Sequence, residues 1–402
     1  MKKYFILLLV SFTILSAKNL FAQKDSIQVT NPYFSKNKVY KVAVFAPLYL
    51  DSVFSGGNLK YQKTLPKFIM PAIDFVQGAM IAFDTIQIND KNVEAHIFDS
   101  KSYTKPMNWL IQNGSLDNFD LIIGAVREPE YSQLAQVALQ KNIPFISAVY
   151  PNQGNVKQNP FTIIVNSTLE AHCEGIFDYI YQKHRQDNIY LIRKKNDTRI
   201  ENYFKDINHP DSGKPYLNIT TISLDSSISS QALRNRLDTT KPMVIIGASL
   251  DEVFARKLAD ACYPIQKTLP LTLIGMPNWD GFRSLNRRGT YKDFPILYTT
   301  PHYNVKSNAY SNFLVKQYFK LYRSKPADIA YKGFEIAYYF INILLEHPGE
   351  VMTHLNENNN GNFHDFNFQP VYPKKSTGIP DYFENKRLFM MQIMNGETTR
   401  VN

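Results

Sequence analysis

Ser249 is the residue whose surroundings come nearest to a catalytic motif. It lies in the stretch IIGASLD, between a predicted strand and a predicted helix, as the serine of a nucleophile elbow does. Such an elbow needs a small residue two positions after the serine, and here that position is Asp251. Ser249 and Asp251 fit better as caps of the following helix. A hydrolase centred on Ser249, which also needs a histidine within hydrogen-bond reach, is therefore the weakest of three functional hypotheses.

The sequence contains no motif for a phosphate, a metal or a nucleic acid. GxGxxG and GxxxxGK[ST] are absent, and the chain has only 17 glycines in 402 residues. The eight histidines form no HxxH or HxxxH pair, whereas a metal site needs three or four converging ligands. The basic residues form no continuous stripe of the kind that binds nucleic acid. We therefore predict no cofactor, no metal and no nucleic-acid partner.

Arg127 is the best candidate for contacting a charged ligand. It lies in a polar loop, residues 125–130, that follows the apolar run DLIIGA, and open α/β sheets bind ligands at the carboxyl ends of their strands. A guanidinium group suits a carboxylate or a phosphate, and a salt bridge to Glu128, to Glu130 or to the neighbouring lobe is the alternative. Aromatic residues that follow predicted strands either stack on the ligand or are ordinary loop residues; they are Tyr49, Tyr103, Tyr150, Trp279 and Tyr303.

The first 22 residues are typical of a secretory signal peptide. Lys2 and Lys3 precede an apolar core of about 12 residues, which is shorter than the ~20 residues that a membrane-spanning helix needs. Cleavage there removes three lysines and lowers the formal net charge from +10 to +7. No cysteine lies near the cut to carry a lipid anchor, so we expect a periplasmic or secreted protein whose residues 23–38 form a mobile leader.

The elements that must position these residues alternate between strands and helices. With 44% apolar and 20% charged residues the chain is ordinary for a globular protein, and the alternation predicts parallel sheets flanked by helices. Strands are predicted at residues 39–48, 93–100, 120–125, 143–149, 160–167, 188–195, 218–224, 242–249, 269–276 and 294–302. The C-terminal residues alternate in polarity around an Asn395-Gly396 turn and are predicted as antiparallel edge strands. Cys173 and Cys262 fall in helix-like segments, where a disulfide and two buried thiols remain alternatives.

The order and spacing of these segments resemble type I periplasmic binding proteins of the leucine/isoleucine/valine-binding branch. These are the solute-binding components of branched-chain amino acid ABC transporters. The segments that carry the resemblance are KVAVFAPL, QGAMIAFD, FDLIIGAV with LAQVALQKNIPFISAV, KPMVIIGASLDEVFARKLADA and YSNFLVKQYFKLYRSKPADIAYKGFEIAYYF. The resemblance implies an α/β fold with two Rossmann-like lobes that close on a ligand like a Venus flytrap.

The resemblance also implies where the chain passes between the lobes. Three hinge crossovers are expected near residues 165–168, 299–303 and 356–363. Lobe 1 would then comprise residues 39–165 and 300–356, and lobe 2 residues 166–299 and 357–402. An apparent insertion between the first strand and the first helix, residues 51–71, is long enough to cover the cleft.

The implied site lies between the lobes, but the family's amino-acid signature is altered here. The two first-lobe loops correspond to Val126-Arg127-Glu128, which lacks the serine-rich run, and to Ser147-Ala148-Val149-Tyr150. Ser249 stands where the family has a tyrosine, and Asp280 is the nearest carboxylate to the position that neutralises an amine. The expected ligand-binding residues are Tyr49, Ser100, Arg127, Glu128, Ser147, Ala148, Tyr150, Asn196, Ser249, Trp279, Asp280 and Tyr303.

The leading hypothesis is an exported solute-binding protein without enzymatic activity. It would capture a small polar ligand, amino-acid-like or other, and an inner-membrane ABC permease would be its partner. The alternative is an envelope sensor or scaffold that uses the same fold to contact a protein or cell-wall partner. The altered pocket and the insertion favour this alternative, and an exposed apolar patch would support it further.

Overall fold

The computed structural model describes residues 38–61, 64–87, 92–209, 213–224, 228–357, 363, 365–373 and 378–401. The predicted signal peptide, residues 1–22, lies outside them, as does the predicted leader apart from Lys38. Among the helices of the described residues, none combines the length and the apolar character needed to cross a membrane.

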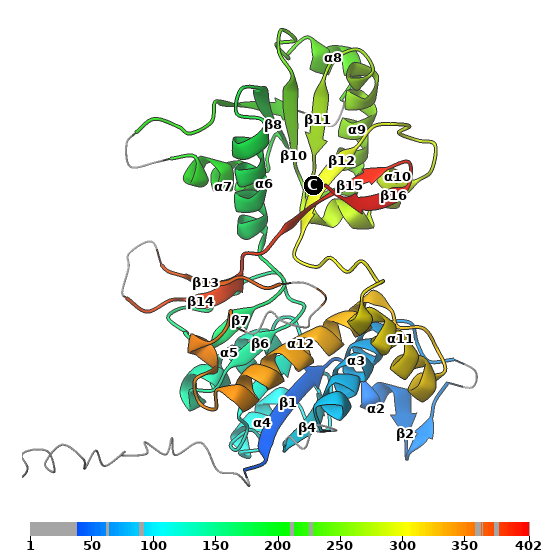
Figure 1. Cartoon of the computed structure of the whole chain (residues 1–402), viewed down its shortest axis with the longest axis vertical. Helices are drawn as coiled ribbons and strands as arrows, with labels where there is room; N and C mark the ends of the chain where they lie inside the picture. Colours follow the sequence, from blue (N-terminus) through cyan, green and yellow to red (C-terminus); the bar gives the residue numbers. More distant parts are fainter. Residues whose placement is uncertain are drawn as a thin grey trace, which may run out of the picture. The chain divides into compact units, whose positions relative to one another are not determined.

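The first sheet has seven strands in the order β13-β14-β7-β6-β5-β1-β4 (Figure 1). Its strands run parallel to their neighbours except for β13, which is antiparallel to β14. The strands are β1 (Tyr40–Ala46), β4 (Val93–Asp99), β5 (Leu121–Gly124), β6 (Phe145–Ser147), β7 (Thr162–Ile164), β13 (Phe368–Val371) and β14 (Tyr382–Asn385).

Helices cover both faces of this sheet, and β1 is apolar throughout for that reason. Val42 and Val44 pack with α3, α11 and α12, whereas Ala43 and Phe45 pack with α4 and α5. Successive strand residues point to opposite faces, so a strand that is buried on both sides needs a continuous apolar run. The helices are α3 (Met70–Gln87), α11 (Ala309–Tyr322) and α12 (Asp328–Glu346) on one face, and α4 (Met107–Gln112) and α5 (Glu130–Lys141) on the other.

Glycines allow α3 and α12 to pack backbone against backbone. A Cβ atom added at Gly78 would lie 1.9 Å from the Ala330 carbonyl oxygen. One added at Gly333 would lie 2.1 Å from the Phe75 carbonyl oxygen. Only glycine fits at either position, since the atoms in the way are backbone atoms that cannot turn aside.

The second sheet also has seven strands, in the order β16-β15-β12-β11-β10-β8-β9. All pairs are parallel except those that β15 makes with β12 and β16. The strands are β8 (Asn188–Lys194), β9 (Ile219–Leu224), β10 (Met243–Ala248), β11 (Leu271–Ile274), β12 (Ile296–Thr300), β15 (Phe389–Met394) and β16 (Glu397–Arg400). The helices associated with it are α6 (Leu169–Lys183), α7 (Arg199–Ile207), α8 (Ser230–Arg234), α9 (Glu252–Gln266) and α10 (Arg283–Asn286).

Both cysteines lie in the core of this second lobe. Cys173 on α6 and Cys262 on α9 are buried and free, so of the two alternatives the structure has separate thiols. Burial raises the pKa of both thiols, which keeps them protonated and inert as nucleophiles.

The predicted α/β fold with two parallel-rich sheets is confirmed, but the predicted third crossover is wrong. Residues 357–402 were expected in lobe 2, whereas β13 and β14 pair within the first sheet, with Phe383 opposite Ile163. After β12, the chain returns to the second sheet only at β15, which pairs with β12. Alternating polarity shows that a segment is a strand and which residues share a face, but it does not show which strand is its neighbour.

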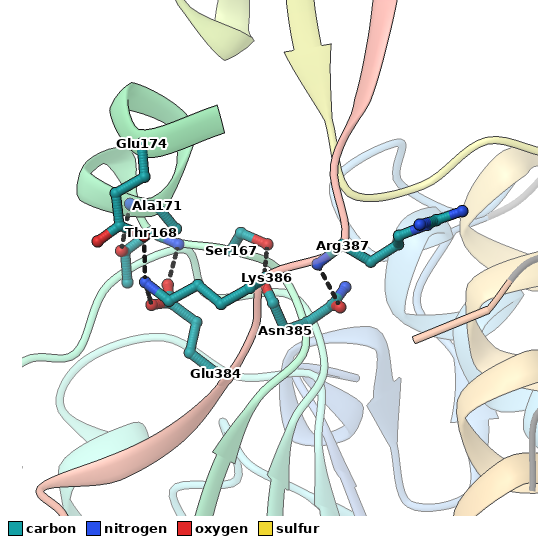
Figure 2. Close-up of polar contacts among 8 residues, drawn as sticks. All are labelled: Ser167, Thr168, Ala171, Glu174, Glu384, Asn385, Lys386 and Arg387. Carbon is teal, nitrogen blue, oxygen red and sulfur yellow. Dashed lines mark hydrogen bonds and ion pairs between the residues drawn. The ribbon is translucent and has the colours of Figure 1, made fainter. Parts of the chain in front are cut away.

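Charged side chains bind together the segments that join the two sheets (Figure 2). The buried carboxylate of Glu384, at the end of β14, accepts the Thr168 backbone N–H at 2.7 Å. Lys386 Nζ lies 2.8 Å from Glu384 Oε2 and 2.7 Å from Glu174 Oε2 on α6. Burial alone would lower the pKa of Lys386, but the two carboxylates outweigh it and raise the pKa. The lysine is therefore charged, and it balances a carboxylate that would otherwise be buried alone.

The insertion after β1 forms α2 (Leu50–Val53) and a two-stranded hairpin, β2 (Phe54–Ser55) and β3 (Asn58–Leu59). The Asp99 carboxylate, at the end of β4, accepts the backbone N–H groups of Leu48, Tyr49 and Leu50 at 2.7–3.0 Å. One carboxylate thus fixes the loop after β1 against the end of the neighbouring strand.

Candidate functional site

A cavity of about 400 Å³ lies beside the first two segments that join the sheets. Its walls come from the loop after β6, residues 166–169, the start of α7, the loops after β10 and β11, residues 299–302 and α12. Its polar lining consists of Asn152, Gln153, Asn166, Ser167, Thr168, His172, Arg199, Tyr203, Asn278, Asp280, Thr299, Thr300, His302 and Lys332.

Residues at the start of α6 form part of the wall of this cavity. Thr168 is the N-cap of α6, and its hydroxyl accepts the Ala171 N–H at 3.4 Å. One turn later His172 is 3% exposed, and its Nδ1 lies 2.7 Å from Thr299 Oγ1 on β12. Burial lowers the pKa of His172 to about 3, so the imidazole is neutral at physiological pH. The cavity therefore has a neutral histidine beside a helix N-terminus.

Charges of both signs face this cavity. Arg199 is the first residue of α7, and its guanidinium forms no ion pair within the described part of the chain. Lys332 comes from α12, and Asp280 comes from the short 3-10 helix η1 (Pro277–Gly281). Burial lowers the pKa of Lys332, an effect that Asp280 opposes. Asp280 is exposed as a residue, yet desolvation of its carboxyl raises its pKa against the effect of Lys332.

A second cavity, of about 470 Å³, shares part of this wall. Asp280, Thr300, His302 and Lys332 line both cavities. The second cavity adds the ion pair between Lys306 and Asp328, whose Nζ–Oδ1 distance is 2.6 Å, together with Tyr298, Tyr303, Tyr331 and Glu335. The two cavities are thus adjacent compartments around Asp280 and Lys332.

Of the twelve residues expected from the sequence, Asp280 and Tyr303 line these cavities. Asp280 lines both, and Tyr303 lines the second cavity, where its ring packs on Phe389 at 5.8 Å. Ser249 and Tyr150 lie one residue away from lining residues, Leu250 and Pro151.

Ser249 does not have the surroundings of a nucleophile. The residue is 1% exposed, and its Oγ accepts the Asp251 N–H at 3.3 Å. Asp251 caps α9 by accepting the Phe254 N–H at 2.7 Å. Asp251 thus has the helix-capping role that the sequence favours, whereas Ser249 bonds the backbone of the cap residue and does not itself cap the helix. The cavity histidine, His172, is bonded to Thr299 instead.

The first-lobe loops place their polar groups elsewhere. The hydroxyls of Ser100 and Ser147 are buried at the ends of β4 and β6 and form no hydrogen bond with the described residues. Ala148 is fully buried, and Tyr49 packs its ring edge-on against Phe68 at 5.2 Å. None of these four residues lines either cavity.

Arg127 is exposed, and neither Glu128 nor Glu130 forms a salt bridge with it. Glu130 pairs with Lys101 at 2.7 Å, and Glu128 accepts the Ser132 hydroxyl at 2.8 Å. Arg127 and Glu128 act in opposite directions on the pKa of Tyr150, which burial raises first of all. An anion-binding role for Arg127 therefore stays a prediction, at a place outside the two cavities.

Two expectations differ from the structure. Trp279 was expected to stack on a ligand, but its indole is fully buried against Gly247 and Gly275 and donates its N–H to the Ser249 carbonyl at 2.9 Å. Asn196 lines a separate, smaller cavity that includes Lys195. The tryptophan supports the loop that carries Asp280 rather than contacting a ligand itself.

Sequence reasoning missed His172, Arg199 and Lys332. His172 and Arg199 lie in the first turns of α6 and α7, a few residues after β7 and β8, and belong to no recognisable motif, whereas Lys332 lies on α12, far in sequence from any strand end. Two of the predicted crossovers, 165–168 and 299–303, do contribute Asn166, Thr168 and Thr300 to the cavity, so residues beside the crossovers were the better place to search.

Solved structures share this fold across nearly the whole chain. A putative branched-chain amino acid ABC transporter from Rhodospirillum rubrum has a TM-score of 0.61 at 11% identity, over 90% of this chain and 100% of that one. A branched chain amino acid ABC transporter periplasmic ligand-binding protein from Burkholderia xenovorans has a TM-score of 0.57 at 10% identity, over 91% and 95%. An ABC transporter substrate-binding protein from Desulfitobacterium hafniense, in complex with Leu, has a TM-score of 0.54 at 12% identity, over 90% and 100%.

These likenesses define the class of fold, which is that of the two-lobed type I periplasmic binding proteins. The chain matches no family model and no curated protein. At 10–12% identity the neighbours show the fold alone, so what this chain binds has to be argued from its own cavity.

Proposed function

We propose that this chain is an exported solute-binding protein that holds a small polar ligand in the cavity beside its crossovers. The ligand class that fits is a small molecule with a carboxylate and a second polar group, such as an amino acid or a related metabolite. Delivery to an ABC-type permease is the transport role that goes with this fold, and no enzymatic step is proposed.

The observation that carries this proposal is the placement of Arg199, Lys332 and Asp280 around one cavity. Two cationic groups against one carboxylate suit an anionic or zwitterionic ligand, and the guanidinium of Arg199 can bind a carboxylate through two hydrogen bonds. The cavity volume of about 400 Å³ falls in the range of small-molecule sites. Neutral His172 adds a hydrogen-bonding group without adding charge.

A thermal-shift screen of the purified protein tests the proposal. Amino acids, other small carboxylates, short peptides, sugars and cell-wall fragments would each be added in excess. A ligand at about 100 times its Kd stabilises a fold by ~2.7 kcal/mol, which gives a measurable rise in Tm. A rise with one chemical class identifies the ligand class, and no rise with any of them contradicts the proposal.

Replacing Arg199 tests whether this cavity is the site. For an anionic ligand found in the screen, we expect Arg199→Ala to weaken binding by about tenfold or more, since a hydrogen bond to a charged group contributes ~1.5–3 kcal/mol. Isothermal titration calorimetry measures the change. Lys183→Ala removes an equal charge from an exposed position on α6 and should leave the Kd unchanged. Equal affinities of Arg199→Ala and wild type would place the ligand elsewhere.

A second candidate function, an envelope sensor or scaffold, is favoured by the exposed apolar residues of the insertion and its flanks. They are Leu50, Phe54, Leu59, Tyr61, Leu65, Phe68 and Met70, each 36–56% exposed. Exposed apolar clusters often mark surfaces that contact other molecules. A photo-crosslinking residue in place of Phe54, tested in cells, should trap a defined envelope partner, and adding Leu59→Ser and Phe68→Ser to the same protein should abolish that adduct. If no defined adduct forms, this function loses its support.

A further inference from the structure

Two histidines and a glutamate converge at the end of α12, away from the residues that line the two cavities. His347 follows the last helical residue, His354 follows the 3-10 helix η2 (Val351–Thr353), and Glu357 is one turn further along. One side-chain ligand atom from each of the three lies within 4.8 Å of the others. The geometry points to a binding site for a single divalent transition-metal ion, of the Zn²⁺ type, formed by His347, His354 and Glu357.

The distances suit this assignment. A ring nitrogen of each histidine lies near the same carboxylate oxygen: His347 Nε2 lies 3.2 Å and His354 Nδ1 lies 2.8 Å from Glu357 Oε2. Two ligand atoms of a tetrahedral zinc site, each about 2.0–2.2 Å from the metal, lie roughly 3.3 Å apart. Each histidine nitrogen therefore already lies at about the right distance from the carboxylate, and all three donor atoms lie within 4.8 Å of one another.

The segment that carries the ligands is held by the core and by backbone hydrogen bonds. Val351 and Leu355, on either side of His354, are 2–3% exposed, and the buried Tyr339 hydroxyl donates to the Leu355 carbonyl at 2.5 Å. The Asn356 side chain bonds both backbone groups of Phe368 on β13. Donors on a segment fixed in this way lose little conformational freedom when an ion binds.

The donor set selects the class of ion. Imidazole and carboxylate together suit Zn²⁺, Ni²⁺ or Cu²⁺, whereas Ca²⁺ and Mg²⁺ prefer oxygen ligands alone. The two rings are stacked 3.7 Å apart and within 3° of parallel, so at least one ring must turn for both nitrogens to point at one ion. The second side-chain torsion of histidine is broad enough to permit this. Glu350 Oε2, 3.4 Å from His354 Nε2, is a further carboxylate beside the site.

Calorimetric titration with ZnCl₂ tests the site. The full-length protein, first stripped with a chelator and desalted, should bind one Zn²⁺ per chain at pH 7.5. His347→Gln, His354→Gln and Glu357→Gln should each weaken binding by at least about tenfold, because loss of an outer-shell partner alone costs 10–100-fold in metal affinity. Bound Zn²⁺ should also raise the Tm of the wild type and not that of the His347→Gln/His354→Gln double variant.

His184→Gln is the matched control. His184 Nδ1 pairs with Asp187 Oδ2 at 2.8 Å, much like the pairs in the cluster, but no other histidine among the described residues shares its carboxylate. It should bind Zn²⁺ like the wild type. Circular dichroism would confirm that each variant is folded, so that lost binding reports on the site. The assignment is overturned if the wild type takes up no Zn²⁺, or if the double variant binds it as tightly as the wild type.

Discussion

At the scale of single residues, burial fixes the charge of the groups around the candidate site. His172 is neutral because its imidazole is buried against Thr299, whereas Lys386 stays charged because two carboxylates surround its ammonium group. The same residue types on an exposed loop would follow their ordinary pKa values. The chemistry of the cavity therefore depends on neighbours that are far away in sequence.

His172 should make stability fall as the pH falls. Its folded-state pKa of about 3 lies below the ordinary 6.5. Between these two pH values the imidazole is protonated in the unfolded chain and neutral in the folded chain. The contribution of His172 to the free energy of unfolding is fully present above about pH 6.5. It falls by about 1.4 kcal/mol per pH unit as the pH is lowered toward 3. Between pH 7 and 5 the wild type should thus lose about 2 kcal/mol more than His172→Gln does. Urea unfolding at both pH values measures the difference, and an identical loss in both proteins would refute the assignment of a neutral His172.

At the scale of elements, two close contacts hold the helices and crossovers in place. One is the glycine contact between α3 and α12, which brings Lys332 to the cavity from the helix that packs on α3. The other is the charged cluster of Figure 2, in which the Ser167 hydroxyl also donates to the Asn385 carbonyl at 2.5 Å. Each contact can be tested by substitution of the residues that form it.

Gly333→Ala should destabilise the first lobe. The new methyl group would overlap the Phe75 carbonyl, and overpacking of this kind costs about 1–3 kcal/mol or more. Gly281→Ala is the control, because a Cβ atom there meets nothing within 4 Å. Urea midpoints of the two variants give the comparison. A Gly333→Ala protein as stable as Gly281→Ala would contradict the close approach of the two helices.

Lys386→Met should be strongly destabilising, by roughly 3–5 kcal/mol, because it leaves Glu384 buried without its partner. Adding Glu384→Gln should restore most of the loss, since the amide oxygen can still accept the Thr168 N–H without carrying a charge. Thermal and urea unfolding of the single and double variants measure this. If the single variant is too unstable to purify, recovery of the double variant is the result that counts. A single variant within about 1 kcal/mol of wild type would show that the cluster is not needed.

At the scale of the whole molecule, ligand binding should slow hydrogen exchange in the segments that join the sheets. Under the proposed function, a bound solute contacts residues 166–169 and 299–302, which line the cavity. We expect the ligand found in the screen to slow amide hydrogen exchange in these two segments, while exchange in the insertion hairpin β2–β3 stays unchanged. Hydrogen-exchange mass spectrometry measures both. Protection confined to other segments would move the ligand out of this cavity.

The sequence by itself determined the α/β class, the alternation of elements and the terminal β15–β16 hairpin with its Asn395-Gly396 turn. These features are local, because polarity patterns and turn residues act over a few neighbouring positions. The helix-capping role of Asp251 was predictable for the same reason.

Only the tertiary structure decided which strands are neighbours and which side chains meet. β14 pairs with β7 from more than two hundred residues away, a choice that no local pattern encodes. Trp279 is buried because Gly247 and Gly275 leave room for its ring. His172, Arg199 and Lys332 line one cavity because three helices converge there, just as His347, His354 and Glu357 meet because the chain turns back at the end of α12. Such sites depend on contacts that folding brings together, and their residues carry no shared sequence motif.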